Sequence, residues 1–241
     1  PTYAGGLGVL AGDIIREASE QEIPLIAIGL YYYEGYSMKS QGLINPASVN
    51  LTPITDEQEN RIIVQLPIQN ILVYVQDWFL QMGSGRVYLL DTNIPQNEEE
   101  NRHITDQLYA SSKEMRFKQE MVLGLGGLRL LEVLQISPSG YHINEGHSAF
   151  LALEIARYEM QKHKCSFQEG LDNSKQHIFF TNHTLVAAGN DTFGTDLASA
   201  LLTGFAKELL VPVSEIINLG LVAGSSIFSM SLLAIRVAGK I

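Results

Sequence analysis

Short apolar segments alternate with longer segments of helical periodicity along this chain, and this order constrains the fold more than any other feature. Such alternation is typical of parallel strands connected by crossover helices. Strands are predicted at residues 25–30, 61–66, 71–78, 87–91, 140–144 and 177–182, and helices at 9–19, 114–134, 148–163, 197–209 and 227–239. The strands between residues 61 and 91 have little helix between them, which predicts an antiparallel insertion. The expected fold is α/β, with a mostly parallel sheet and this antiparallel insertion.

The composition is that of a globular, acidic protein. The chain has 241 residues, of which 46% are hydrophobic, so it can bury a substantial core. A formal net charge of −10 argues against nucleic acid as a partner, because phosphates would be repelled. No apolar run reaches the roughly 18 residues of a membrane span, and no signal peptide is recognised, so no membrane partner and a cytoplasmic location are expected. The single cysteine, Cys165, is interpreted as a packing residue.

A glycine-rich segment, residues 4–13, precedes the first predicted helix and reads AGGLGVLAGD. A turn of this kind at a helix N-terminus presents free backbone N–H groups to an anion, such as a phosphate or a sugar phosphate. The segment also matches the dinucleotide fingerprint G-x-G-x-x-[GA] at Gly6, Gly8 and Ala11, with Glu34 about 20 residues further on. A purely structural turn is the third interpretation, and the residues alone leave all three open.

Two polar clusters that contain histidine follow short apolar strands. The first reads YHINEGH at residues 141–147, and the second reads FFTNHT at residues 179–184. Open α/β sheets bind ligands at the carboxyl ends of their strands, so the two clusters and the glycine segment are expected to meet along one rim. Amides and imidazoles there suit a polyhydroxylated ligand, because they are directional donors and acceptors with little net charge. The candidate residues in the clusters are Asn144, Glu145, His147, Asn182 and His183.

Structural roles for the histidines compete with this interpretation. His147 could cap its helix, and His183 could hold a loop carbonyl. A metal site built from His142, Glu145, His147 and His183 is conceivable, but the spacing H-x-x-x-x-H does not place both histidines on one helical face, so no metal is predicted. No nucleophile elbow supports a hydrolase. The remaining histidines are interpreted as surface or edge residues: His103, His142, His163 and His177.

Five segments, in this order, resemble motifs of the α-glucan phosphorylases, the family of the glycogen, starch and maltodextrin phosphorylases. They are YAGGLGVLAGD at residues 3–13, KEMRFKQE at 113–120, NEGHSAF at 144–150, TNHT at 181–184 and FSMSLLAIR at 228–236. Together they extend over nearly the whole chain. Five ordered motifs are far more specific than a single glycine segment.

The resemblance implies a retaining glycosyltransferase of the GT-B type, in which two Rossmann-like domains face each other across a cleft. The family transfers the glucosyl unit at the non-reducing end of an α-1,4-glucan to inorganic phosphate, which gives glucose 1-phosphate. Its cofactor is pyridoxal phosphate, which a lysine of the C-terminal domain binds and whose phosphate supplies the proton. No catalytic residue is therefore expected in this chain. Residues 1–241 are expected to be an incomplete N-terminal Rossmann-like domain that is cut at both ends and inactive alone, and a homodimer fits the family.

The resemblance also implies roles for individual residues. Gly5, Gly6 and Leu7 match the loop whose backbone N–H groups meet phosphate and sugar. His183 matches the histidine that holds the glucosyl unit, and His147 matches the histidine beside it. Weaker candidates for contact with the substrate are Asn144, Glu145, Asn182 and Ser112. The sequence departs from bacterial members of the family at 110–112, Leu185, Ala187 and Asn190, which puts the substrate preference in question.

Overall fold

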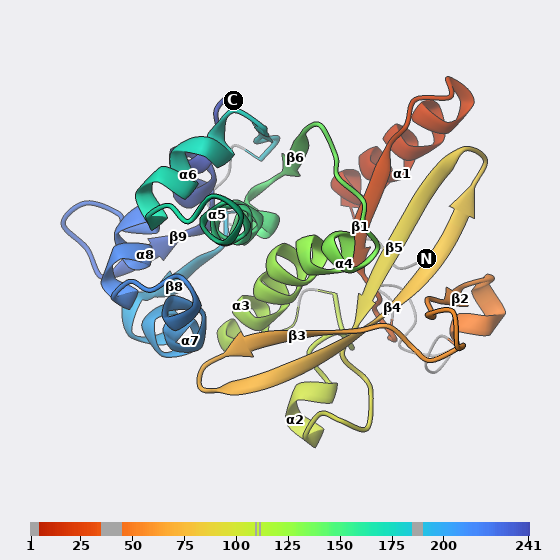
Figure 1. Cartoon of the computed structure of the whole chain (residues 1–241), viewed down its shortest axis with the longest axis horizontal. Helices are drawn as coiled ribbons and strands as arrows, with labels where there is room; N and C mark the ends of the chain where they lie inside the picture. Colours follow the sequence, from red (N-terminus) through yellow and green to blue (C-terminus); the bar gives the residue numbers. More distant parts are fainter. Residues whose placement is uncertain (1–4, 35–44, 109, 111, 185–189) are drawn as a thin grey trace. The chain divides into compact units, whose positions relative to one another are not determined.

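The computed structural model describes residues 5–34, 45–108, 110, 112–184 and 190–241 (Figure 1). It divides into two compact units, one of residues 1–65 and 73–119 and one of residues 66–72 and 120–241. The elements in chain order are α1 (Gly5–Glu20), β1 (Ile26–Leu30), η1 (Pro46–Val49), β2 (Thr52–Pro53), β3 (Ile63–Ile68), β4 (Ile71–Met82), β5 (Gly85–Asp91), α2 (Glu99–Arg102), α3 (Lys113–Met121), η2 (Val122–Gly126), α4 (Gly127–Val133), β6 (Tyr141–Asn144), η3 (Gly146–Ser148), α5 (Phe150–His163), α6 (Phe167–Lys175), β7 (Ile178–Thr181), β8 (Thr192–Gly194), α7 (Thr195–Glu208), α8 (Val213–Gly220), β9 (Ile227–Ser229) and α9 (Met230–Val237).

The first unit is built on a mixed sheet with the strand order β1-β5-β4-β2, and β3 pairs with β4 outside this path. Strand β1 is parallel to β5, whereas β4 is antiparallel to both β5 and β2. Tyr31 and Leu51 are buried in this unit, and Tyr33, Trp78 and Leu89 are among the side chains that pack against them. The α/β class and the antiparallel insertion between residues 61 and 91 are therefore confirmed.

Helix α1 begins at Gly5, four residues before the predicted start. The segment expected to be a glycine-rich turn is thus largely helical over its described residues. Glycine costs only about 1 kcal/mol per residue in a helix, which a helix that is already propagating tolerates. The prediction of a loop at residues 5–8 was wrong, although the N–H groups of Gly5, Gly6 and Leu7 still lie in a first helical turn, where they lack intrahelical acceptors.

Two buried aspartates of the first unit differ in how their charge is satisfied. Asp91 accepts hydrogen bonds from the Tyr33 hydroxyl (2.8 Å), Gln76 Nε2 (2.7 Å) and Trp78 Nε1 (2.8 Å). Asp77 is fully buried, and among the described residues neither of its carboxylate oxygens has a hydrogen-bond partner. Burial, together with the charge of Asp91, raises the pKa of Asp77 well above its usual range. The folded protein therefore favours the protonated form of Asp77.

We expect Asp77→Asn to gain stability relative to the wild type as the pH rises. The unfolded chain releases the Asp77 proton near pH ~4, but the folded chain holds it to a higher pH, so the wild type loses stability as the pH rises above ~4. Asparagine does not titrate and escapes this loss. Thermal unfolding of both proteins at about pH 5 and about pH 7.5 measures the change. A constant difference between the two proteins would contradict the assignment, and Asp13→Asn, on the exposed face of α1, is the control.

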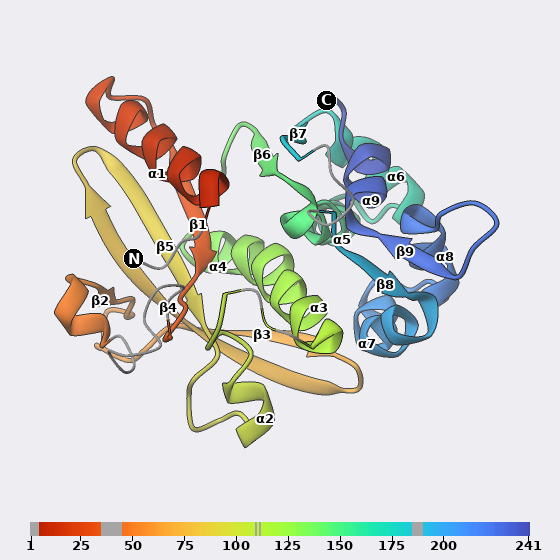
Figure 2. The same cartoon turned by 180° about the vertical axis from the view of Figure 1, so that it is seen from behind.

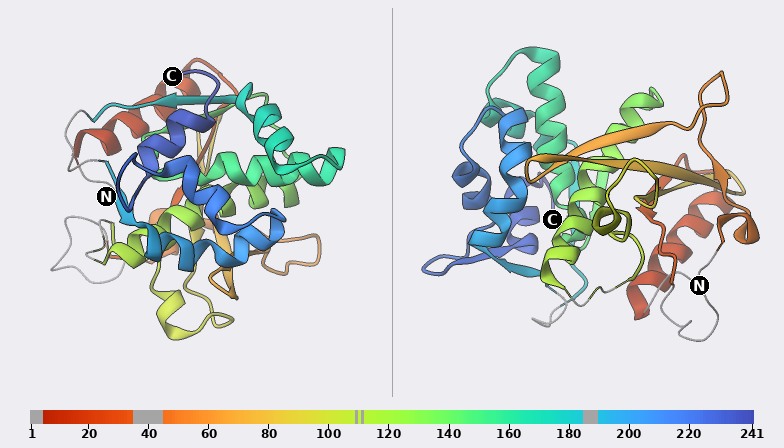
Figure 3. Two further views of the ribbon diagram at one scale, coloured as in Figure 1. Left: turned by 90° about the vertical axis from the view of Figure 1, so that its left-hand side faces the viewer. Right: turned by 90° about the horizontal axis from the view of Figure 1, so that it is seen from below.

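The second unit contains the parallel pair β6–β7 and the antiparallel pair β8–β9, with helices packed around them (Figure 2). The tip of the β3–β4 hairpin belongs to this unit and lies on α7 (Figure 3). There the Gln69 N–H donates to the Leu201 carbonyl (2.8 Å), and Lys207 Nζ donates to Asn70 Oδ1 (2.7 Å). Helix α9 begins at Met230, because residues 227–229 form β9 and the Ser229 hydroxyl caps the helix. The prediction that this helix begins at residue 227 was therefore wrong.

The long helix predicted at residues 114–134 forms as α3, η2 and α4, with a π-helical turn at η2. Its glycines were expected to let another backbone approach closely. At Gly124 this is confirmed, since a Cβ atom there would lie 2.7 Å from the backbone nitrogen of Leu151 in α5. A π-turn is rare and widens a helix locally. At this position it accompanies the close packing of η2 against α5.

A buried ionic network joins helices α4, α5 and α7 of the second unit. The Glu154 carboxylate is fully buried and accepts from Arg129 Nε (2.7 Å) and Arg157 Nε (2.6 Å). Arg129 also pairs with Glu208, and Arg157 pairs with Glu132 (3.0 Å). Each buried charge of this network therefore has a partner of opposite charge.

In the described part of the chain, no helix is long and apolar enough to cross a membrane.

Candidate functional site

The two histidine clusters leave neighbouring strands at the same edge of a sheet. Strands β6 and β7 are parallel, and Asn144 lies opposite Thr181 at their carboxyl ends. The Glu145 N–H then donates to the Thr181 carbonyl (2.9 Å), which joins the starts of the two polar segments. The prediction that the two histidine clusters meet at one sheet edge is confirmed for Asn144 and Glu145, which contact Thr181 and His183 within the second unit.

The His183 loop is held by side chains of the neighbouring segment. The ring nitrogen Nε2 of His183 lies 2.9 Å from Asn144 Oδ1, an amide oxygen that accepts. A neutral ring with its proton on Nε2 keeps Nδ1 as an acceptor. Asn182 Oδ1 accepts from the Thr184 N–H (2.9 Å), so its amide shapes the turn. The His183 side chain itself is exposed, which leaves the ring accessible to a ligand.

The Glu145 carboxylate holds the His183 loop through hydrogen bonds. Its side chain is buried, and Oε1 accepts from the His183 N–H (2.6 Å) and the Thr184 hydroxyl (3.1 Å). The backbone at Glu145 has a φ of 67°, a region that a residue with a Cβ atom rarely occupies. Such strain persists where surrounding contacts over-determine the backbone. The structure gives Glu145 a contact with the loop, and its direct contact with a substrate stays a prediction.

His147 lies between two carboxylates. Its Nδ1 atom is 3.1 Å from Asp191 Oδ2 and 3.5 Å from Glu120 Oε1. Burial alone would lower the pKa of His147, but the hydrogen bonds and charges of Asp191 and Glu120 outweigh it and raise that pKa to about 9. Burial raises the pKa of Glu120 to about 8, with His147 acting in the opposite direction. The cluster thus retains a proton at neutral pH.

Sequence reasoning missed Glu120 and Asp191 as members of the site. The carboxylate oxygens of Glu120 and Asp191 and a ring nitrogen of His147 lie within 4.8 Å of one another. Among the described residues, these three side chains are the group that could hold a metal ion. The imidazole lies 3.1 Å from Asp191 and 3.5 Å from Glu120, so a cationic partner for the two carboxylates is present without a metal. The metal ligands considered from the sequence do not come together as one site. His142 Nε2 lies 2.9 Å from the Thr181 hydroxyl, and Glu145 accepts from the N–H of His183.

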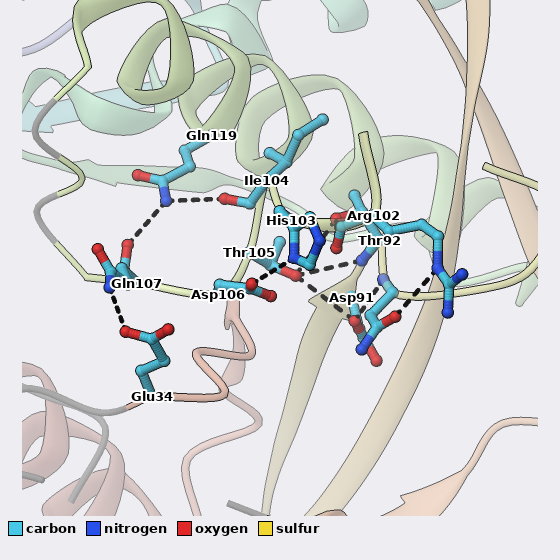
Figure 4. A network of polar contacts seen from close by, with 11 residues as sticks. Glu34, Asp91, Thr92, Arg102, His103, Ile104, Thr105, Asp106, Gln107 and Gln119 are labelled. Carbon is cyan, nitrogen blue, oxygen red and sulfur yellow. Dashed lines mark hydrogen bonds and ion pairs between the residues drawn. The ribbon is translucent and has the colours of Figure 1, made fainter. Parts of the chain in front are cut away.

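The other histidines are exposed, as predicted: His103, His142, His163 and His177. His103 pairs with Asp106 (2.6 Å) in the segment that leads to α3. In the same network, Gln119 Nε2 donates to the carbonyls of Ile104 and Gln107, each at 2.8 Å, and the Gln107 side chain donates to Glu34 (Figure 4). Glu34, expected to bind ribose in a dinucleotide domain, is thus tied to the loop of the first unit.

Ser112 has a structural contact in the first unit. Its hydroxyl accepts from the Met115 N–H (3.3 Å) at the start of α3, as an N-terminal cap does. The dinucleotide fingerprint does not have its required structural context. Gly6, Gly8 and Ala11 lie inside α1, whereas the fingerprint needs its glycines in a turn between strand and helix. The departures at Leu185 and Ala187 lie outside the described residues, and Asn190 accepts from the Ser231 hydroxyl (2.6 Å).

Comparison with known proteins gives a consistent set of relatives. No protein-family model matches this chain. The chain is 38% identical to the maltodextrin phosphorylase of Thermococcus litoralis and 33% identical to the glycogen phosphorylase of Mycobacterium tuberculosis, with 100% of this chain and 30% of each relative covered. It is 32% identical to the glycogen phosphorylase of Aquifex aeolicus, with 90% of this chain and 33% of the relative covered. The chain therefore spans about a third of the length of these curated relatives.

Proposed function

This chain is related along its length to the maltodextrin and glycogen phosphorylases, and on that premise we propose that the full-length protein is an α-1,4-glucan phosphorylase. Its reaction is the transfer of the glucosyl unit at the non-reducing end of a glucan to inorganic phosphate, which releases glucose 1-phosphate. The observation that carries the proposal is the paired arrangement at β6 and β7, where polar segments that match the family's motifs end side by side. We propose further that residues 1–241 belong to one Rossmann-like domain of a GT-B enzyme.

Within this proposal, the ring of His183 contacts the glucosyl unit. The Asn144 and Glu145 side chains hold the ring and backbone of His183, so its orientation is fixed before a ligand binds. Preorganisation of this kind favours catalysis because the ring has little orientational freedom left to lose on the way to the transition state. His147 contacts the sugar beside His183, with Asn182 as a weaker candidate. For the first unit, the resemblance implies substrate contacts through the N–H groups of Gly5, Gly6 and Leu7 and through Ser112, and these stay predictions.

Pyridoxal phosphate is the cofactor that the family implies, and the described residues do not fit it. The buried groups around His147 are the carboxylates of Glu120 and Asp191, which would repel its phosphate. Lys118 is buried, but it pairs with Glu100 and Glu114, each at 2.8 Å. We therefore assign the cofactor to another part of the full-length protein and derive no step through it. A homodimer and a cytoplasmic location remain predictions.

The full-length protein, supplied with pyridoxal phosphate, should release glucose 1-phosphate from maltodextrin only when inorganic phosphate is present. Coupled detection of glucose 1-phosphate measures this release, and the reverse reaction from glucose 1-phosphate and a primer provides a second readout. Release of free glucose without phosphate dependence would contradict the proposal. Binding of maltodextrin without either product would instead favour a non-catalytic glucan-binding module.

A further inference from the structure

The proposed function gives Glu120 no role, although its carboxylate is among the least accessible acidic groups of the second unit. The side chain of Glu120 is 5% exposed, and among the described residues neither oxygen has a hydrogen-bond partner. The oxygen Oε1 lies 3.5 Å from Nδ1 of His147, longer than a hydrogen bond but close enough for a strong charge interaction. A buried carboxylate without hydrogen bonds is costly, so its retention needs an explanation.

Three separate segments bring this cluster together. Glu120 comes from α3, His147 comes from η3, and Asp191 precedes β8. The last two are anchored to the start of α9: the Met230 N–H donates to the Asp191 carbonyl (3.1 Å), and a Cβ atom at Gly146 would lie 2.9 Å from the Ser231 nitrogen. Both Asp191 and the turn that carries His147 are thus held by the same helix end, which makes their separation a fixed feature of the fold.

The two carboxylates occupy the same side of the imidazole. Both face Nδ1, so this nitrogen carries a proton in either charge state of the ring. The atom Nε2 has no hydrogen-bond partner among the described residues, and about a third of the side chain is exposed, at 32%. Because Nδ1 faces the two carboxylates, Nε2 is the ring nitrogen that is left for a ligand.

We propose that Glu120 is a positioning residue that, together with Asp191, fixes His147 as a doubly protonated ring whose Nε2 donates a hydrogen bond to an oxygen of the sugar. This inference rests on the proposed function for the identity of the ligand, but not for the state of the ring. A ring held in this way donates and does not accept, so His147 acts as a binding group rather than a general base. It would recognise a hydroxyl or ring oxygen through one of its lone pairs.

The charges around His147 agree with this assignment. Glu120 faces it from α3 and Asp191 from the segment before β8. Helix α9 packs against η3, and its charged residue, Arg236, donates instead to the carbonyls of Asn218 and Leu219. Strand β6 contributes His142, which contacts Thr181. Acidic groups thus dominate the surroundings of the ring, and they keep its pKa at about 9, above the usual value for histidine.

The test is an NMR titration of the His147 ring in the full-length protein carrying ¹³C-labelled histidine, with the signal assigned by its loss in His147→Gln. The wild-type ring should remain charged through neutral pH. Glu120→Gln should lower its titration midpoint by about 1 pH unit or more, because one neighbouring carboxylate is removed. Glu120→Asp should restore much of the wild-type value. Glu114→Gln, which removes a carboxylate of the same helix that pairs with Lys118, should not move it.

Steady-state kinetics supply the second readout. The KM for glucose 1-phosphate should vary little with pH in the wild type, whereas in Glu120→Gln it should rise several-fold as the ring loses its charge, with a smaller effect on kcat. An unchanged His147 titration in Glu120→Gln would overturn the positioning role, as would a charged ring with an unchanged KM profile. If Glu120→Gln does not fold, Asp191→Asn carries the same test. A shifted titration in a protein without phosphorylase activity would contradict the proposed function and leave the positioning of the ring supported.

Discussion

Replacing Glu154 by alanine is expected to destabilise the second unit by about 3–5 kcal/mol, the usual cost of breaking a buried ion pair from one side. The carboxylate of Glu154 is fully buried and pairs with both Arg129 and Arg157. Its removal leaves two guanidinium groups in the interior without their shared acceptor. Their remaining partners, Glu208 and Glu132, are more exposed and cannot follow them inward.

Denaturant unfolding of the wild type and of three variants measures this loss. Glu154→Gln keeps one acceptor oxygen and should fall between the wild type and Glu154→Ala. Glu159→Ala is the matched control, because Glu159 lies on the same helix and pairs with the exposed His163, at 3.3 Å. Its loss should be below about 1 kcal/mol. Equal effects of Glu154→Ala and Glu159→Ala would contradict a structural role of the network.

His183→Ala is expected to lower kcat/KM of the full-length protein by about 100-fold or more, with little change in stability. The side chain is exposed, so its removal creates no core cavity, while its Nε2 contact with Asn144 shows that the ring is held in one orientation. The loss should therefore fall on turnover. Initial rates of phosphorolysis measure it, with thermal unfolding as a check on the fold.

His142→Ala is the control for this prediction. His142 lies on the neighbouring strand, is exposed and contacts Thr181 (2.9 Å), but the proposal gives it no contact with the substrate. Its rate should stay within a few-fold of the wild type. A large loss in both variants would indicate a general disturbance of this sheet edge, and no loss in His183→Ala would refute the role of His183.

Much of the strand pattern could be predicted because buried strands form short apolar runs that local sequence reveals. The pair β6–β7 lies within the predicted ranges, and its polar segments meet as expected. Helix α6 was missed although Ser166 and Glu169 form a capping box, a pattern that is visible in the sequence. Its weakly apolar sequence masked that signal. The start of α9 was misplaced because residues 227–229 pair with β8, a long-range contact that helical periodicity does not reveal.

The members of the candidate site were predictable only in part. His147 and His183 follow strands, so their placement follows from the topology. Glu120 stands in a run of polar residues, Lys118 to Glu120, on a helix whose apolar stripe includes Met121, and nothing local distinguishes a buried carboxylate from a solvated one. Its role becomes visible only when η3 brings the His147 ring beside it. Asp191 belongs to a segment with no predicted element, and its position depends on α9.

A crystal structure of the full-length protein with glucose 1-phosphate bound would test the central claim most directly, because that claim locates the sugar at the carboxyl ends of β6 and β7. The account predicts the glucosyl ring within hydrogen-bond distance, about 2.7–3.2 Å, of His183 and of Nε2 of His147. It also predicts that Nδ1 of His147 still faces Glu120 and Asp191 in that complex. A sugar bound elsewhere, with neither ring in contact with it, would contradict the account.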